Sequence, residues 1–139
     1  MAWSRGNRSA VIRVPAVERN SAKSKRIEFR APDPSANPYL AFSAIVAAGI
    51  DGVSKKIEPG DPVNENIYRL SESRKRALGI RPLPSSLQEA FAALKNDYVY
   101  LQSYFLSELL QSYLDLKEHE IKEGDGKGRS WQIRRYYDV

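Results

Sequence analysis

The sequence predicts an α+β fold in which a short antiparallel strand pair is followed by a mainly helical C-terminal region. In two segments near the N-terminus, residues 9–14 and 26–30, side chains divide between two faces with the two-residue period of a strand. From residue 38 onward, apolar residues recur instead at helical spacing, and proline and glycine separate the helical segments.

The first strand is expected at residues 9–14, after a loop at residues 3–7. Three apolar side chains share one face of this strand, and Arg13 lies on the other. Pro15 ends the strand. The polar, basic connection 16–25 is longer than a tight hairpin but can join two antiparallel neighbours.

The second strand, residues 26–30, has one apolar and one charged face. Ile27 and Phe29 occupy the apolar face. Arg26, Glu28 and Arg30 occupy the charged face. If the two strands pair, Arg13 of the first lies near this charged face. A solvated outer face is the simplest interpretation of such a strand, but the residues that follow it favour a functional one.

The helix expected at 38–51 begins with two standard signals. Asn37 is a typical N-cap residue, and Pro38 is favoured in the first helical turn. Apolar residues surround most of the helix, which predicts that it is buried on most sides. The dipeptide Asp51-Gly52 is expected to end it.

The rest of the chain is expected to be helical apart from its turns. Proline and glycine pairs indicate a surface loop at 54–66. Ser86 and Glu89 have the spacing of a capping box. Further helices are expected at 71–78, 87–95 and 97–122, the last with an alternative break near Ser103 or Ser107. A short aromatic tail, 130–139, follows a glycine-rich link.

Composition limits the classes of function. The chain has 139 residues, enough for one domain, with 22 basic and 17 acidic residues and a net charge of +5. This charge suits nucleic acid, a membrane surface or an anionic substrate such as a nucleotide. Nucleic acid is the least favoured partner, because the arginines are concentrated in two motifs and no aromatic platform is interleaved with them.

Cysteine is absent, which excludes disulfides and thiolate metal sites and makes the reducing cytoplasm the expected compartment. The longest apolar run, residues 39–50, has about half of the roughly 20 residues that span a bilayer. We therefore expect a soluble protein without a membrane partner.

The charged face of the second strand has chemistry that can be stated. A carboxylate such as Glu28 can bind Mg²⁺, which usually takes one or two protein carboxylates together with substrate phosphates. Arg30 would lie roughly 7 Å away on the same face and can bind a carboxylate or phosphate with two hydrogen bonds. Arg8, Arg13 and Arg26 would add positive charge where a transferring phosphoryl group needs it.

Two long motifs then resemble a known family. N-R-S-A-V-I-R-V-P at 7–15 and R-I-E-F-R-A-P-D-P-S-A-N-P-Y-L at 26–40 resemble the C-terminal part of the catalytic domain of bacterial and archaeal glutamine synthetase. The similarity extends from residue 2 to residue 139, although subunits of that family are several times longer. The resemblance implies that the strand pair belongs to a larger active-site barrel.

The resemblance also implies substrates and residue roles. Members phosphorylate glutamate with ATP, using Mg²⁺ or Mn²⁺, and ammonia then displaces phosphate. By motif, Glu28 would bind the metal, Arg30 would grip glutamate, and Arg8 would be the catalytic residue that stabilises the transferring phosphoryl group and touches both substrates. The ATP-binding positions would be Arg8, Arg13, Lys23 and Arg26.

Two further features follow from the resemblance. Tyr68 falls where some bacterial members carry a tyrosine that is adenylylated, although residues 71–83 look more like the subclass without this modification. The tail, 131–139, resembles a segment that joins opposite rings of the parent homo-oligomer. Packing of the tail on its own domain is the alternative.

The family's other metal ligands, its ammonia site and most of its nucleotide pocket lie upstream of the matched part, so we expect little activity from this chain alone. It would require an N-terminal glutamine synthetase chain or full-length subunits as partners. The alternatives are a non-catalytic module that associates with full-length subunits, and part of a related ligase that joins glutamate to a larger amine.

Overall fold

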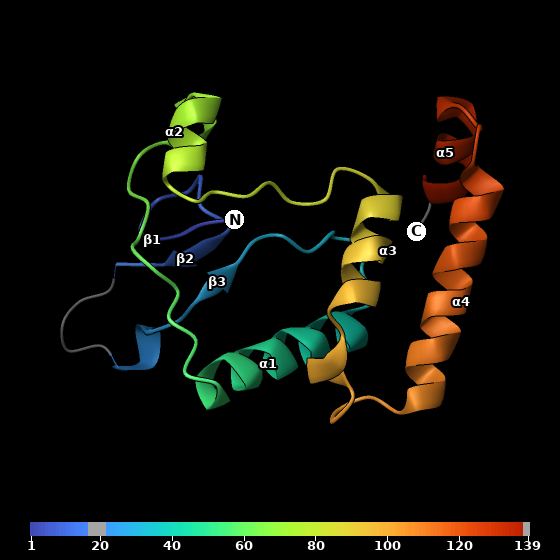
Figure 1. Cartoon of the computed structure of the whole chain (residues 1–139), viewed down its shortest axis with the longest axis horizontal. Helices are drawn as coiled ribbons and strands as arrows, with labels where there is room; N and C mark the ends of the chain where they lie inside the picture. Colours follow the sequence, from blue (N-terminus) through green and yellow to red (C-terminus); the bar gives the residue numbers. More distant parts are fainter. Residues whose placement is uncertain (17–21, 138–139) are drawn as a thin grey trace. The chain divides into compact units, whose positions relative to one another are not determined.

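The computed structural model describes residues 1–16 and 22–137, and they form two compact units. The first unit contains residues 1–34 and 57–83, and the second contains residues 35–56 and 84–139. A small sheet lies in the first unit and most of the helix in the second, so the α+β prediction is confirmed (Figure 1).

The sheet of the first unit has three strands in the order β1-β2-β3, with β1 at Trp3–Arg5, β2 at Ile12–Val14 and β3 at Glu28–Phe29. Strands β2 and β3 are antiparallel, with Ile12 opposite Phe29 and Arg13 opposite Glu28, as expected. Both strands are shorter than the segments 9–14 and 26–30.

Strand β1 was not expected, and the prediction of a loop at 3–7 is wrong for its first three residues. β1 runs parallel to β2, with Trp3 opposite Ile12. The carbonyl of Trp3 also accepts a hydrogen bond of 2.9 Å from the amide of Val63, and Ser4 is completely buried. Partners distant in sequence therefore impose the extended conformation on a segment with little strand signal of its own.

The remainder of the first unit is connected by short helical elements. η1 is a 3-10 turn at Ala22–Ser24, η2 is another at Ile67–Arg69, and α2 is a short helix at Glu72–Ala77. Gly79 ends the last of these with a φ of 64°, the left-handed conformation that glycine adopts without strain. The expected surface loop at 54–66 is only partly exposed, because Val63 is buried.

Helix α1, Pro38–Ser54, opens the second unit. The side chain of Asn37 accepts hydrogen bonds from the amides of Tyr39 and Leu40, so the expected N-cap is present. The helix continues about one turn past the expected end at residue 51. An ion pair of 2.7 Å between Asp51 and Lys55 spans this extra turn.

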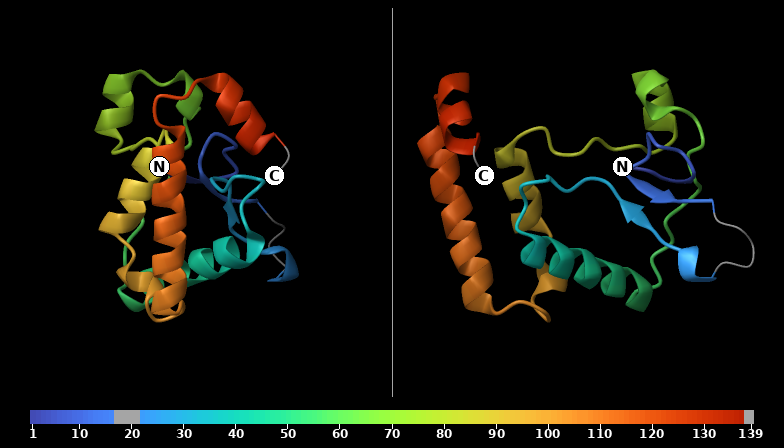
Figure 2. Two further views of the ribbon diagram at one scale, coloured as in Figure 1. Left: turned by 90° about the vertical axis from the view of Figure 1, so that its right-hand side faces the viewer. Right: turned by 180° about the vertical axis from the view of Figure 1, so that it is seen from behind.

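Four more elements complete the second unit: α3 at Leu87–Asn96, η3 at Val99–Leu101, α4 at Ser107–Gly124 and α5 at Arg129–Tyr136. The Ser86 hydroxyl caps α3 by accepting from the amide of Glu89. The single helix predicted at 97–122 is wrong, because η3 and α4 are separate, and α4 starts at Ser107, one of the two considered breaks. The tail forms α5, which turns back beside the end of α4 (Figure 2).

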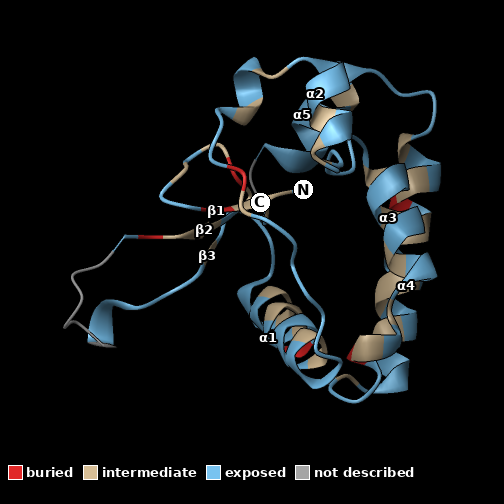
Figure 3. Cartoon of the chain, turned by 60° about the vertical axis from the view of Figure 1, so that its left-hand side comes forward, coloured by how far each residue is buried: buried red, intermediate tan, exposed pale blue. Residues whose placement is uncertain are grey.

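Each unit has a small core (Figure 3). Ala10 and Val63 are buried in the first unit, and Ala47 and Leu101 in the second. The prediction that helix 38–51 is buried on most sides is wrong, since Ala47 is the one buried residue of α1, all of whose residues the structure describes. Within the described part of the chain, none of the helices combines the length and apolar character needed to cross a bilayer.

Candidate functional site

The charged face of the sheet is built around the carboxylate of Glu28. Arg13 Nη1 lies 2.9 Å from Glu28 Oε2 across the β2–β3 pair. Arg26 donates from Nε at 3.1 Å and from Nη2 at 2.9 Å to the other oxygen, Oε1. The prediction that Arg13 lies near the charged face of the second strand is therefore confirmed. Arginine side chains bind both oxygens of the Glu28 carboxylate.

The segment carrying Arg8 is joined to the end of β3. Arg30 Nη1 donates a hydrogen bond to the backbone carbonyl of Arg8, and the Arg30 amide donates to the carbonyl of Val11 at 2.9 Å. These bonds bring together two positions that are 22 residues apart in sequence. The Arg8 side chain is exposed, so its guanidinium group is accessible.

Asn7 and Ser9, which flank Arg8, hold the Arg8 segment against residues 63–67. The amide nitrogen of Asn7 donates to the carbonyls of Val63 at 2.9 Å and Glu65 at 2.8 Å. Asn7 Oδ1 accepts from the amide and hydroxyl of Ser9, whose hydroxyl accepts from the amide of Ile67 at 2.9 Å. Sequence reasoning assigned no role to either side chain, although their place beside Arg8 in the N-R-S-A motif was an available signal.

An ion pair fixes the far end of this segment. Arg74 of α2 contacts Glu65 at 2.6 Å. This hydrogen bond lowers the pKa of the Glu65 carboxyl below its ordinary value. Residues 63–67 are thus connected to the Arg8 segment on one side and to α2 on the other.

A hollow of about 460 Å³ lies beside Arg8. It is lined by Arg5, Asn7, Arg8, Ser9, Asn64, Asn66 and Tyr68. No residue in this lining is acidic, and two of them are arginines. An anion such as a phosphate or carboxylate is therefore the ligand class that the lining suits.

A second hollow, of about 630 Å³, shares Arg5 with the first. Its lining is Arg5, Val14, Pro15, Ala16, Lys25, Arg26 and Ile27. It thus contains one of the expected nucleotide-binding residues, Arg26. Two others lie outside both linings: Lys23 is exposed on η1, and Arg13 contacts Glu28.

The residues present do not fit a complete divalent metal site. In residues 1–16 and 22–137, no group of three or more histidine, cysteine, aspartate and glutamate side chains is placed to hold a metal ion. Glu28 supplies one carboxylate, and two guanidinium groups already compensate its charge. A metal at Glu28 requires further ligands that this part of the chain does not provide.

Comparisons with known proteins agree with the two sequence motifs. The family profile described as "Glutamine synthetase, catalytic domain" matches residues 1–136. The glutamine synthetase of Sulfolobus acidocaldarius is 51% identical over 138 residues, which are 99% of this chain and 29% of that protein. The glutamine synthetase of Thermotoga maritima is 44% identical over 137 residues, which are 98% of this chain and 30% of that protein. The chain therefore spans less than a third of the length of these relatives.

Proposed function

The chain belongs to the glutamine synthetase catalytic-domain family, and from that premise we propose that it is the C-terminal portion of an ATP-dependent glutamate–ammonia ligase. In this reaction the glutamate side-chain carboxylate attacks the terminal phosphorus of ATP, forming γ-glutamyl phosphate and ADP. Ammonia then attacks the acyl carbon and displaces phosphate. The proposal depends on two contacts beside the paired strands β2 and β3. Arg30 donates a hydrogen bond to the backbone of Arg8, and Arg13 forms an ion pair with Glu28.

The geometry supports separate tasks for the arginines. Arg30 grips the glutamate carboxylate, because a guanidinium group offers two parallel donors to a carboxylate. The backbone carbonyl of Arg8 accepts a hydrogen bond from Arg30, so the two residues are neighbours. Arg8 presents its exposed guanidinium group to the transferring phosphoryl group. The nucleotide is bound by Arg8, Arg13, Lys23 and Arg26.

Glu28 would supply one ligand to the Mg²⁺ or Mn²⁺ of the assembled enzyme. Such a cation would supply positive charge to the nucleotide phosphates. The remaining ligands would have to come from the part of the catalytic domain outside the matched stretch. Arg13 and Arg26 hold the Glu28 carboxylate in place and counter its charge.

The proposal also names partners, compartment and a modification site. The substrates are glutamate, ATP and ammonia, and the partner is the N-terminal part of a glutamine synthetase or its full-length subunits, in a cytoplasmic homo-oligomer. Tyr68 is the candidate adenylylation site. Its side chain is 80% exposed beside the Arg8 hollow, which meets the requirement for access by a modifying enzyme.

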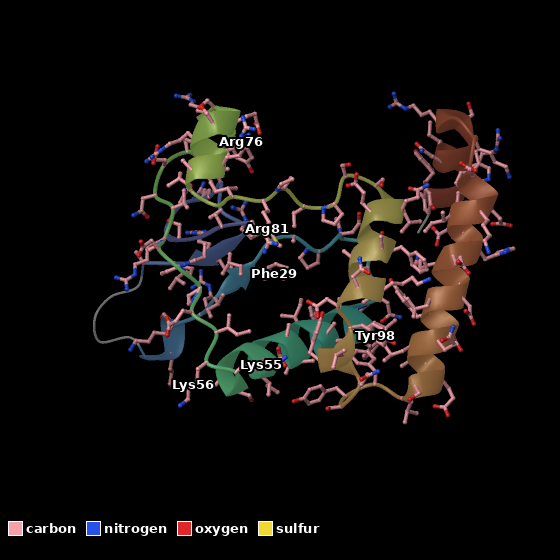
Figure 4. The ribbon with its side chains drawn as sticks, in the orientation of Figure 1. Phe29, Lys55, Lys56, Arg76, Arg81 and Tyr98 are labelled. Atoms are coloured by element: carbon pink, nitrogen blue, oxygen red, sulfur yellow. The ribbon has the colours of Figure 1, made fainter. Side chains whose placement is uncertain are left out.

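The test measures phosphate release that depends on ATP and glutamate, with ammonia and Mg²⁺ present. The chain is assayed alone and after co-expression with the part of Sulfolobus acidocaldarius glutamine synthetase outside the matched 138 residues. We expect turnover only from the co-expressed pair, and its loss in Glu28→Gln and Arg30→Ala. Arg76→Ala is the matched control, since Arg76 is exposed on α2 (Figure 4). Equal turnover by all variants would contradict the proposal.

A second candidate is a non-catalytic module that associates with full-length subunits. The single carboxylate of the charged face and the exposed apolar surface of α1 favour it. This candidate predicts stable association without turnover. The assay described above separates the two functions if association of the chain with the co-expressed part is measured together with phosphate release.

A further inference from the structure

One side of helix α1 is a continuous stripe of exposed apolar side chains. Its members are Tyr39, Phe42, Val46, Ile50 and Val53, with exposed fractions of 82%, 67%, 59%, 43% and 81%. The steps between them are three, four, four and three residues. At 3.6 residues per turn these steps place all five side chains along one face of the helix.

The stripe lacks the charges that a solvent-facing helix surface normally carries. Asp51 is the one charged residue between Pro38 and Ser54, and it is only partly exposed, in an ion pair with Lys55. The other residues exposed along this side, Ser43 and Gly49, are small and uncharged. The composition of α1 is therefore that of a helix buried on more than one side.

A neighbouring side of α1 already has its contacts. Ala47, which follows Val46 and lies about 100° around the helix from it, is 1% exposed, and α1 packs against η3, whose Leu101 is also buried. Within its own unit α1 is therefore anchored through one face. The apolar stripe lies on a different side of the helix, and it remains available for a further element.

We propose that the α1 stripe is the docking surface for the part of a glutamine synthetase catalytic domain that lies outside the matched stretch. The inference rests on the proposed function. The length of the relatives supports this occupant, since this chain corresponds to only 29% of one relative and 30% of another. More than two thirds of the family's subunit is thus available to cover the stripe, and its contacting surface must be apolar and free of unpaired charge.

A second copy of this chain is a poorer occupant. The stripe has no charged residues at its margins that would fix the register of a helix pair. Moreover, Ile27 of the first unit is 72% exposed and Phe29 is 42% exposed. Pairing of two α1 stripes accounts for none of this exposed apolar area, whereas the larger remainder of the relatives' domain can cover it as well.

The first experiment measures association of the chain with the co-expressed remainder of the Sulfolobus acidocaldarius enzyme. We expect Phe42→Gln and Val46→Gln each to weaken binding at least about tenfold, because glutamine keeps the helix but removes buried apolar area. Leu116→Gln on α4, where Leu116 is 56% exposed, is the matched control and should bind as the parent does. Circular dichroism checks that the variants keep their helix content.

A second measurement does not depend on assembling separate pieces. The chain has no cysteine, so Phe42→Cys introduces a single thiol at the centre of the stripe. In the chain alone this thiol should be labelled rapidly. In a hybrid where the chain replaces the matched 138 residues of the Sulfolobus enzyme, labelling at position 42, read by peptide mass spectrometry, should slow at least about tenfold. Leu116→Cys, which places a thiol on α4 outside the stripe, is the control for any general slowing of labelling in the hybrid.

Equal labelling of position 42 in the chain and the hybrid would overturn the inference. Unchanged binding by Phe42→Gln and Val46→Gln would also overturn it, while leaving the proposed ligase activity intact. A dimer of the chain alone that Phe42→Gln dissociates would assign the stripe to a second copy instead. Association that depends on α1 but shows no phosphate release would support the docking surface and contradict the proposed activity.

Discussion

Arg13 Nη1 lies 2.9 Å from Glu28 Oε2, and the two residues are directly opposite each other in the register of β2 and β3. The two side chains are 23% and 27% exposed, so solvent screens this ion pair less than an exposed one. The Nε of Arg13 is buried without a hydrogen-bond partner among the described residues. The charged face is thus a partly satisfied network with one donor left for a further acceptor.

We expect Glu28→Gln to lower the free energy of unfolding by about 1 kcal/mol, because Arg13 and Arg26 both lose the charge of their shared acceptor. Urea unfolding of the chain measures this change. Glu72→Gln is the control, since Glu72 is 78% exposed in its pair with Lys75 and its loss should lower the free energy of unfolding less than Glu28→Gln does. Equal effects of the two substitutions would show that the Glu28 network adds nothing beyond a surface pair.

Asn7→Ala should lower the free energy of unfolding by about 1–3 kcal/mol, because two backbone carbonyls and the Ser9 hydroxyl lose their partner. Hydrogen exchange should also accelerate at the amides of Val63 and Ile67, which lie in the segment that Asn7 and Ser9 hold. Ser54→Ala, at an exposed position at the end of α1, is the control. Unchanged protection of both amides would contradict this role for Asn7.

The features that sequence reasoning predicted correctly are those with local causes. Asn37 and Ser86 each cap a helix by accepting hydrogen bonds from amides two or three residues ahead, so the signal lies within one turn. The antiparallel pairing of β2 and β3 follows in the same way from alternation within two short segments.

The features that it missed depend on distant partners. Strand β1 is stabilised by Val63, about 60 residues later, and the bonds of Asn7 reach across a similar separation. The residue types at the charged face were predictable, since their alternation is visible in R-I-E-F-R. The exposure of α1 was not, because periodicity shows that an apolar face needs a cover but not which chain supplies it.

Gly124→Ala should displace α5 from the end of α4. A Cβ at position 124 would lie 2.9 Å and 3.0 Å from two atoms of the Trp131 ring, closer than such contacts allow. We expect a shift in Trp131 fluorescence and a loss of stability of about 1 kcal/mol or more. Gly49→Ala is the control, because nothing lies within 4 Å of its added methyl group and alanine favours the helix by roughly 0.5–1 kcal/mol. An unshifted emission spectrum in Gly124→Ala would contradict this packing.

Alkaline pH should release α5, because Tyr136 of α5 donates a hydrogen bond to the buried carboxylate of Glu120 on α4. Burial and this bond raise the pKa of Tyr136 from an ordinary 10.0 to about 12. A raised tyrosine pKa means that the folded state favours the protonated form. Its contribution to stability is therefore complete below pH 10 and is lost as the pH rises toward about 12.

Acidic pH should weaken the same α4–α5 contact by protonating the Glu120 carboxylate. Burial works to raise the pKa of Glu120, but hydrogen bonds from Lys117 and Tyr136 outweigh burial, and the net pKa is lowered from 4.5. The contribution of the ionised carboxylate to stability is therefore present above pH 4.5 and is lost as the pH falls through the lowered pKa. The α4–α5 contact is thus most stable in the interval between these two transitions.

Fluorescence of Trp131 in a Trp3→Phe background measures both transitions, since the Trp131 ring packs edge-on against Tyr136 with 6.0 Å between centroids. Tyr136→Phe should remove the alkaline transition near pH 12, and Glu120→Gln should remove the acidic one. Tyr137→Phe should retain both, because Tyr137 is 87% exposed. An alkaline transition that persists in Tyr136→Phe would show that another group controls the release of α5.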